Sequence, residues 1–301
     1  MTVRSHRPLI GGIAVYLMVI LNGLTMAGYL FIMAIGLNLS FGLMRICNMN
    51  HGTFYLLGGF IGWSVIKATE NWWLGLLAAA VVVGLIAFLE EFLLLRRARG
   101  KTTMETLITL SLSIIGTDLI IAIWTGKTRQ IDIPDFAKGI FRVDNFFFPK
   151  FNIFIICFAA AIGLIFWLIY QKTKIGMILR AGVDNFEIVA ACGINIKRLF
   201  TAVFAVSGAL AGIAGVFGGT YQMLVSGQDG TVMIYTLLVV IIGGIGSFGG
   251  AILGSIFIGL IYTIGTMLAP QFSYFFLFAP VALVLAFRPQ GLFGKVGRIN
   301  D

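Results

Sequence analysis

The chain has 301 residues, of which 59% are hydrophobic and only 11% are charged, and its mean hydropathy is +1.01. A soluble domain carries roughly 25% charged residues, so this composition excludes a soluble protein and predicts an integral membrane protein. The formal net charge of +9 does not indicate nucleic-acid binding, because most lysines and arginines lie in short segments that flank apolar runs.

Apolar runs of about 20 residues recur along the whole chain, long enough to cross a hydrocarbon core of about 30 Å as helices. We therefore predict one membrane domain over residues 1–301. It should be an all-α polytopic bundle of about eight to ten transmembrane helices, with broken or re-entrant segments and a short cytoplasmic helix. In chain order, the predicted elements are 9–43, 53–68, 74–95, 104–125, 151–170, 199–217, 231–245, 250–268 and 273–287.

The basic flanks predict the sidedness of these elements. Segments 96–103, 171–198 and 288–301 are rich in lysine and arginine and are placed in the cytoplasm. Segment 126–150 carries mixed charge and is placed outside. With this arrangement, the elements from residue 74 onward alternate correctly across the membrane.

The first element is ambiguous. Three apolar blocks precede Arg96, and this odd number would place the N-terminus outside, against the basic residues Arg4 and Arg7. Either residues 9–43 cross twice or the flank rule fails there. We expect a broken first element.

A polar segment at 36–59 follows this element. Burying Asn38, Asn48, Asn50 and His51 would be costly unless they are hydrogen-bonded. The segment is either a discontinuous helix that lines a substrate path, or a surface turn whose asparagines cap helix ends. A metal or general-base role is not expected for His51, because no carboxylate lies near it in sequence.

Three acidic residues lie in the next predicted spans. Asp118 lies within 104–125, and an intramembrane carboxylate predicts a function such as proton relay by default. The alternative is a capping or snorkelling role near the end of that helix. Glu90 and Glu91 precede the basic pair at 96–97 and are expected to form ion pairs with it.

The loop 171–198 carries the signals of a short, separate helix. We expect Asp184 to be its N-cap, Glu187 to reach back to the cap amide, and Gly193 to end the helix in a left-handed conformation. A helix of roughly two turns is marginal alone in water, so it should rest on the bundle and meet a partner. Phe186, Val189, Ala190 and Gly193 would form one face, and Asp184, Glu187 and Ala191 the other.

Glycines have two expected roles. The run GGIGSFGG at 243–250 should break a helix, because each interior glycine costs about 1 kcal/mol against alanine. A break at membrane depth is tolerated only against protein or a water-filled cavity. Glycines at four-residue spacing, such as Gly208 and Gly212, should allow helix backbones to approach closely.

The sequence lacks the motifs of an enzyme. It contains no GxxxxGK[ST] phosphate loop and no HExxH or GxSxG motif. Cys47, Cys157 and Cys192 are far apart and form no CxxC pair. We therefore expect neither an enzymatic activity nor a cofactor or metal bound by this chain.

Four motifs together resemble the permease subunits of bacterial branched-chain amino acid ABC importers, and most closely the LivH-type subunit. They are NMNHG at 48–52 after GLNLSFG, GIN at 193–195, GGIGSFGG at 243–250 and RPQGLFG at 288–294. The resemblance covers nearly the whole chain. Each motif alone would be weak, but four in this order are specific.

The resemblance implies a multi-pass permease of the bacterial inner membrane that imports leucine, isoleucine and valine. Its partners would be membrane lipid, a second permease of the LivM type, two cytoplasmic ATPase subunits that hold ATP and Mg, and an extracytoplasmic substrate-binding protein, with no nucleic acid. It gives a role in coupling to the ATPase to Arg180, Asp184, Asn185, Phe186, Glu187, Ala191 and Gly193. It places Asn38, Asn48, Asn50, His51, Gly52, Gly243, Gly244, Gly246 and Gly249 along the translocation path.

Two departures from the family pattern leave alternatives open. The coupling loop has NFEIV at 185–189 where the family commonly has Asp-Pro-Glu-Ala-Ala, and the motif at 48–52 replaces Asn-Phe-Ala-His-Gly. The substrate could therefore also be urea, a short amide or another amino acid. An ion- or proton-coupled secondary carrier that uses Asp118 is the alternative from a different class.

Overall fold

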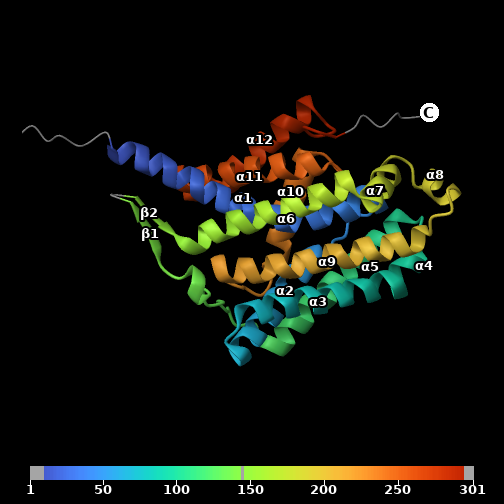
Figure 1. The fold of residues 1–301 in the computed structure, drawn as a ribbon, viewed down its shortest axis with the longest axis horizontal. Coiled ribbons are helices and arrows are strands. Elements are labelled where there is room, and N and C mark those ends of the chain that lie inside the picture. The colour runs from blue at the N-terminus through green and yellow to red at the C-terminus, as the bar shows by residue number, and fades with distance from the viewer. Residues whose placement is uncertain (1–9, 144–145, 295–301) are drawn as a thin grey trace, which may run out of the picture.

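The computed structural model describes residues 10–143 and 146–294, and most of its helices run along one common direction (Figure 1). The prediction of an all-α membrane bundle is confirmed. The longer helices are α1 (Ile10–Met44), α2 (His51–Thr69), α3 (Trp72–Glu90), α5 (Thr102–Trp124), α6 (Lys150–Lys172), α9 (Ile196–Tyr221), α10 (Asp229–Gly243), α11 (Phe248–Leu268) and α12 (Ser273–Phe287). The shorter elements are the π-helical turn η1 (Glu91–Leu95), α4 (Arg96–Ala98), the 3-10 turns η2 (Asp135–Ala137) and η3 (Pro270–Phe272), the strands β1 (Ile140–Val143) and β2 (Phe146–Pro149), α7 (Lys174–Asp184) and α8 (Phe186–Ala191).

Seven segments of the described chain are long and apolar enough to cross a membrane. They are Val15–Met44, Trp72–Ala98, Thr102–Trp124, Lys150–Lys172, Ile196–Tyr221, Phe248–Leu268 and Pro270–Phe287. Helices α2 and α10, with 19 and 15 residues, complete the apolar elements that the sequence predicts.

The expectation of a broken first element is wrong, because α1 is one helix of 35 residues. Its glycines serve close packing instead of a break. A Cβ atom at Gly42 would lie 2.4 Å from the Cα of Gly246, and one at Gly36 would lie 2.9 Å from the carbonyl oxygen of Ser207. Residues 10–44 are therefore one helix and not two shorter ones. Arg4 and Arg7 are not among the described residues.

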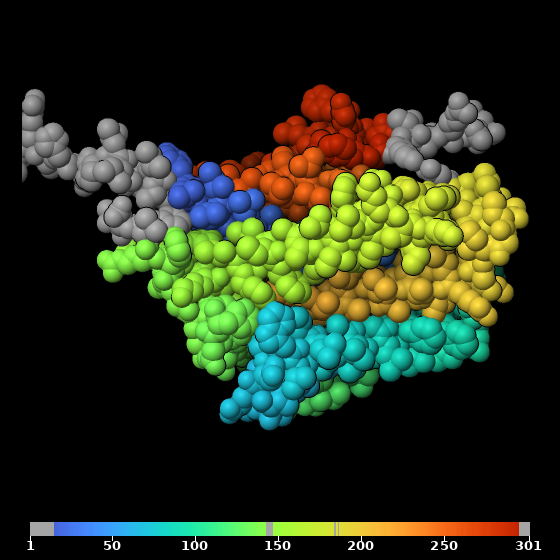
Figure 2. Space-filling view, in the orientation of Figure 1, coloured from blue at the N-terminus to red at the C-terminus, as the bar shows by residue number. Residues whose placement is uncertain are grey.

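The two ends of the bundle differ in what they carry. The first described turn of α1 and the antiparallel hairpin of β1 and β2, in which Ile140 pairs with Pro149, lie at one end (Figure 1). Helices α4, α7 and α8 lie at the other. The basic segments predicted to be cytoplasmic at 96–103 and 171–198 thus share an end, opposite the loop at 126–150. In the view of Figure 2, α6 and α7 form part of the surface nearest the viewer, and α8 lies beyond them at the end of the molecule.

Helices α1 and α9 form the centre of the bundle, whereas α5, α6 and α12 are mostly exposed. Glycines bring α9 into backbone contact with its neighbours. A Cβ atom at Gly212 would lie 2.7 Å from the carbonyl oxygen of Ala79 in α3, and one at Gly58 in α2 would lie 2.3 Å from the Cα of Gly212. This confirms the predicted close packing at small residues.

Candidate translocation path and coupling surface

The predicted break at 243–250 is present between α10 and α11. Gly244 and Gly246 have φ values of 98° and 77°, a left-handed conformation that glycine adopts without a side-chain clash. The Ser247 hydroxyl then caps α11 by accepting a hydrogen bond from the amide of Gly250 at 3.0 Å. The chain thus ends one helix and begins the next within four residues.

A side chain of α1 holds this break. The Nδ2 of Asn38 donates to the carbonyl oxygen of Ser247 at 2.8 Å, and the amide of Gly246 donates to the Oδ1 of Asn38 at 2.7 Å. Asn38 is only 4% exposed, and a buried carboxamide needs hydrogen-bond partners. This turn supplies one for its oxygen and one for its nitrogen. The structure therefore brings Asn38 together with Gly246, both of which the resemblance places on the path.

The C-terminal motif returns to the same place. The amides of Leu292 and Phe293 donate to the carbonyl oxygens of Ile242 and Gly243 at 2.7 and 3.1 Å. Gly249, by contrast, is exposed, and a Cβ atom there would meet nothing within 4 Å. Within the glycine run at 243–250, Gly243 is therefore tightly packed, whereas Gly249 faces open space.

The segment after α1 is buried, so its interpretation as a surface turn is wrong. Asn48, Asn50 and His51 are each at most 2% exposed. The Nε2 of His51 lies 3.0 Å from the carbonyl oxygen of Met33, eleven residues before the end of α1. At 1.5 Å per residue, α2 therefore begins about 16 Å back from that end.

Several polar atoms of this segment have no partner among the described residues. They are the Nδ2 of Asn48, the Oδ1 of Asn50 and the Nδ1 of His51. Gly52 is tightly packed, because a Cβ atom there would lie 2.3 Å from the carbonyl oxygen of Asp229. The starts of α2 and α10 therefore meet inside the bundle.

Two acidic residues lie at this meeting point: Glu90, for which the sequence analysis predicted a different partner, and Asp229, which it did not single out. The Nδ2 of Asn50 donates to both carboxylate oxygens of Glu90, at 2.8 and 3.0 Å. The hydroxyl of Thr117 donates to the Oδ2 of Asp229 at 2.8 Å, and that of Thr53 reaches the same oxygen at 3.5 Å. These partners are far apart in sequence, so no local motif could have indicated them.

The expected ion pairs of Glu90 and Glu91 with the basic pair at 96–97 are wrong. Glu91 is fully buried in η1, where it pairs with Arg99 and accepts a hydrogen bond from Thr201 of α9. The Arg99 guanidinium also lies 4.3 Å from the ring centroid of Phe200. Burial lowers the pKa of Arg99, and the neighbouring Glu91 opposes this effect.

Asp118 is exposed on α5, although its neighbour Thr117 points to Asp229. Among the described residues, no hydrogen bond or ion pair is found for Asp118. Its proposed roles in capping and in proton relay both stay predictions.

The short helix predicted after Arg180 is present as α8, but its cap is Asn185 and not Asp184. Asp184 is the last residue of α7, whereas Asn185 is extended and its Oδ1 accepts hydrogen bonds from the amides of Glu187 and Ile188 at 2.9 and 3.3 Å. Asparagine and aspartate cap helices about equally well, so the backbone conformation decides between the two neighbours. Gly193 ends the helix at φ 82°, as predicted.

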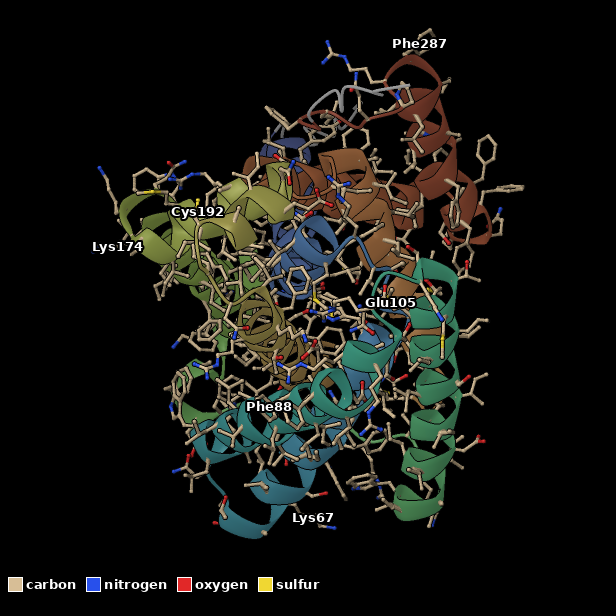
Figure 3. The ribbon with its side chains drawn as sticks, turned by 90° about the vertical axis from the view of Figure 1, so that its right-hand side faces the viewer. Lys67, Phe88, Glu105, Lys174, Cys192 and Phe287 are labelled. Carbon is tan, nitrogen blue, oxygen red and sulfur yellow. The ribbon has the colours of Figure 1, made fainter. Side chains whose placement is uncertain are left out.

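The faces of α8 agree only partly with the prediction. Val189 is 3% exposed and rests on the bundle, whereas Ala190 is exposed together with Glu187 and Ala191. Ile188 is 62% exposed and adds an apolar residue to the outer face. The side chains of Asp184 and Phe186 lie outside the described part. Seen from this end, Cys192 and Lys174 lie at the edge of the molecule (Figure 3).

Helix α7, which the sequence analysis did not predict, connects α8 to the bundle. The Thr173 hydroxyl caps it by accepting a hydrogen bond from the amide of Gly176 at 3.1 Å. Arg180 belongs to α7, with its guanidinium 5.1 Å from the ring centroid of Tyr170. Val183 lies against the break, since a Cβ atom at Gly246 would be 3.0 Å from its Cγ1.

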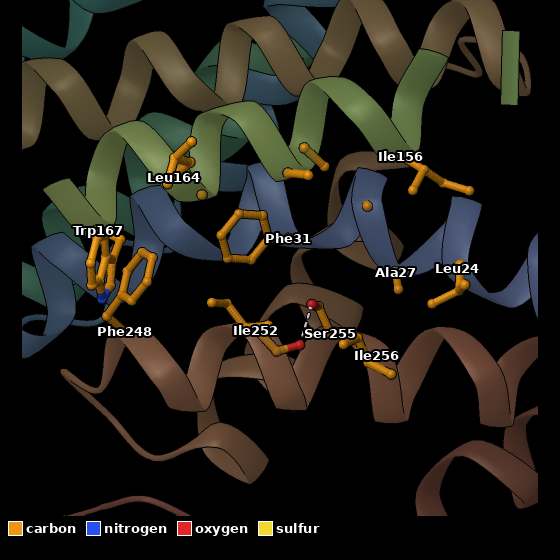
Figure 4. Close-up of a pocket in the computed structure, with 14 residues that line it drawn as sticks. Leu24, Ala27, Phe31, Ile156, Leu164, Trp167, Phe248, Ile252, Ser255 and Ile256 are labelled. Atoms are coloured by element: carbon orange, nitrogen blue, oxygen red, sulfur yellow. Dashed lines mark hydrogen bonds between the residues drawn. The ribbon is translucent and has the colours of Figure 1, made fainter. Parts of the chain in front are cut away.

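A cavity of about 400 Å³ lies between α1, α6 and α11 (Figure 4). Phe31, Trp167 and Phe248 are among its mostly apolar walls. Its polar side chain is Ser255, whose hydroxyl donates to the carbonyl oxygen of Ile252 at 2.8 Å. A zwitterion would find no charged partner here, so this cavity does not suit an amino acid.

Comparison with known proteins identifies the family. The family described as "Branched-chain amino acid transport system / permease component" matches residues 19–285. The chain belongs to this family. It is 25% identical to the high-affinity branched-chain amino acid transport system permease protein LivH of Escherichia coli K12 and to BraD of Pseudomonas aeruginosa, each over 93% of this chain and 96% of the relative.

An archaeal relative is similar over a somewhat smaller part. The probable branched-chain amino acid transport permease protein LivH of Methanocaldococcus jannaschii is 26% identical over 81% of this chain and 79% of its own. No solved structure matches the chain. Together with the seven candidate spans, the family assignment supports a multi-pass permease of the bacterial inner membrane.

Proposed function

We propose that this chain is a permease subunit of an ABC importer that carries leucine, isoleucine and valine into the cell. The similarity to LivH and BraD over 93% of the chain carries this proposal. Two partner ATPase subunits hydrolyse ATP with Mg, a second permease of the LivM type completes the path, and an extracytoplasmic binding protein delivers the substrate.

The ATPase subunits dock at α8. This helix lies at the end of the bundle that carries the basic segments, and its exposed residues Glu187 and Ile188 are available to a partner. Movement of α8 passes through α7, because Val183 lies against Gly246 at the break between α10 and α11. ATP-driven closure of the partner then shifts the population between inward-open and outward-open states.

A charge reversal on α8 tests the docking role. Glu187→Arg is expected to abolish uptake of radiolabelled leucine in cells that also produce the matching binding protein, the second permease and the ATPase subunits. The amount of chain in the membrane should stay unchanged, because Glu187 is exposed and contributes little to packing.

Lys174→Glu is the matched control, since it reverses one exposed charge in α7 at the same end. It should keep uptake near the level of the unchanged chain. Normal uptake by Glu187→Arg would contradict the docking role of α8.

Two further measurements separate the alternatives. Uptake that stops without the ATPase subunits but persists in Asp118→Asn would exclude an ion-coupled carrier that uses Asp118. Competition of leucine uptake by unlabelled leucine, but not by urea or short amides, would support branched-chain amino acids as the substrate.

A further inference from the structure

Two carboxylates face the start of α2 without a cationic partner. Glu90 of α3 is held by Asn50, and Asp229 of α10 is held by Thr117 and Thr53. The described residues form two ion pairs, Glu91 with Arg99 and Asp135 with Lys138, and neither involves these two acids.

Both acids lie beside the N-terminus of a helix. Asp229 lies in the first turn of α10, and Glu90 contacts the first residues of α2. Both helix starts lack a side-chain cap, because neither Asn50 nor Gln228 accepts a hydrogen bond from the following turn. The partial positive charge of a helix N-terminus stabilises a carboxylate. Negative charge inside a membrane bundle nevertheless remains costly without a cation.

A free acceptor lies beside these acids. Asn50 is 2% exposed, and its Nδ2 is engaged by Glu90, but its Oδ1 has no hydrogen-bond partner. This oxygen lies toward α5, 3.9 Å from where a Cβ atom of Gly116 would be. A buried, unpaired acceptor calls for a donor that the described chain does not supply.

The four groups lie along the start of α2. Asn50 and Thr53 are three residues apart at the start of α2 and therefore lie on the same face of the helix. Asn50 contacts Glu90 and Thr53 contacts Asp229, so the two acids flank this face. An ammonium group offers three N–H donors, which match the carboxylates and the free Oδ1 of Asn50.

We propose that Glu90, Asn50, Thr53 and Asp229 bind the ammonium group of the substrate during its passage. This inference rests on the proposed importer function and assigns named residues to the ammonium end of the amino acid. It argues against urea and amides as substrates, because they carry no cationic nitrogen. The carboxylates accept hydrogen bonds from the ammonium group, whose single positive charge offsets part of their negative charge.

Neutral isosteres of the two acids test the site. In cells with the complete transporter, Glu90→Gln and Asp229→Asn should each lower the rate of leucine uptake by roughly tenfold or more, because a charge-assisted hydrogen bond is lost. Asp118→Asn, an exposed acid of α5 beside Thr117, is the matched control and should keep normal uptake. Both isosteres should retain ATP hydrolysis stimulated by the binding protein, which a docking defect would abolish.

Competitors separate the chemistry of the ligand. Unlabelled leucine should compete with uptake of labelled leucine. Isovaleramide and urea should not be transported measurably by the unchanged chain. Normal leucine uptake by both isosteres would overturn the proposal, as would urea uptake at the rate of leucine. If either isostere fails to reach the membrane, Thr117→Val is used in its place, because it removes the hydroxyl that holds Asp229. Thr117→Val should lower leucine uptake, and Thr117→Ser, which keeps a hydroxyl, should retain it.

The two proposals fail differently. Leucine uptake without the ATPase subunits would contradict the importer function, yet the acid variants could still be compared with the unchanged chain. Conversely, strict ATP dependence with full activity of Glu90→Gln and Asp229→Asn would leave the importer intact and remove the ammonium site.

Discussion

At the residue scale, one carboxamide determines the shape of the break between α10 and α11. Asn38 supplies one donor and one acceptor to consecutive residues of a turn that lies more than 200 positions away in the sequence. Because Asn38 is buried, its removal would leave the amide of Gly246 without this partner, whereas the carbonyl oxygen of Ser247 would keep its hydrogen bond from the amide of Ala251. The turn is therefore fixed by α1 and not by its own sequence alone.

Two glycines of the same motif should respond oppositely to alanine. Gly246→Ala is expected to destabilise the protein by about 1–2 kcal/mol, because φ is 77° and a Cβ atom would lie 3.0 Å from Val183. Gly249→Ala should be neutral or slightly stabilising, since α11 favours alanine and nothing lies within 4 Å. Thermal unfolding of the purified protein in detergent measures both, and equal midpoints would contradict the difference.

The sequence indicates the break at 243–250 because five glycines fall in eight positions. It does not indicate that Asn38 holds the turn, or that Asn50 holds Glu90, because those pairs depend on tertiary contacts. The cap of α8 was displaced by one residue for a related reason: two adjacent residue types can both cap, and only backbone conformation selects one.

At the element scale, the π-helical turn η1 connects three parts of the chain. It continues α3 without a loop and turns Glu91 toward Arg99 and toward Thr201 near the start of α9. The residue before it, Glu90, contacts Asn50 on another side. Adjacent residues of a helix point about 100° apart, so the two acids face different neighbours.

Breaking the buried pair in η1 should be costly. Arg99→Met is expected to lower the free energy of unfolding by about 3–5 kcal/mol, because it leaves the fully buried Glu91 without a counter-charge. The double variant Glu91→Gln with Arg99→Met should recover much of that loss. Detergent-denaturation curves measure it, and additive losses in the double variant would contradict the pairing.

The continuity of α1 shows why element boundaries were harder to predict than element types. The count of apolar blocks and the basic N-terminal flank suggested a break in 9–43, but the helix is continuous, and its Gly36 and Gly42 lie against other backbones. Helix α7 was missed because its lysine and arginine resemble a polar loop, although Thr173 caps it. Tertiary support overrides local composition in both cases.

At the scale of the whole molecule, the two ends of the bundle predict opposite accessibility. Cys192, exposed beside α8, should be labelled by a membrane-impermeant maleimide only after cells are permeabilised. Lys138→Cys, near the hairpin at the other end, should be labelled in intact cells. Cys47→Ala and Cys157→Ser remove the other thiols, and labelling of Cys192 in intact cells would contradict the assigned sidedness.

The overall class, the number of apolar elements and the separation of the basic segments followed from hydropathy and charge alone. The meeting of α2 and α10 did not, because it depends on a segment that returns beside Met33. Amphipathic patterns record which side of a helix is buried, but they do not record where a helix starts along the membrane normal.

The residues after α12 are part of this architecture. Leu292 and Phe293 extend the hydrogen bonding of α10 beyond its last turn, and Gly291 packs against Gly244 at the break. A chain shortened to end at Phe287 would leave the carbonyl groups of Ile242 and Gly243 without these donors. The C-terminal segment therefore stabilises the end of α10 at the break. A fusion partner joined close to Gly291 would disturb the same turn that α7 contacts through Val183.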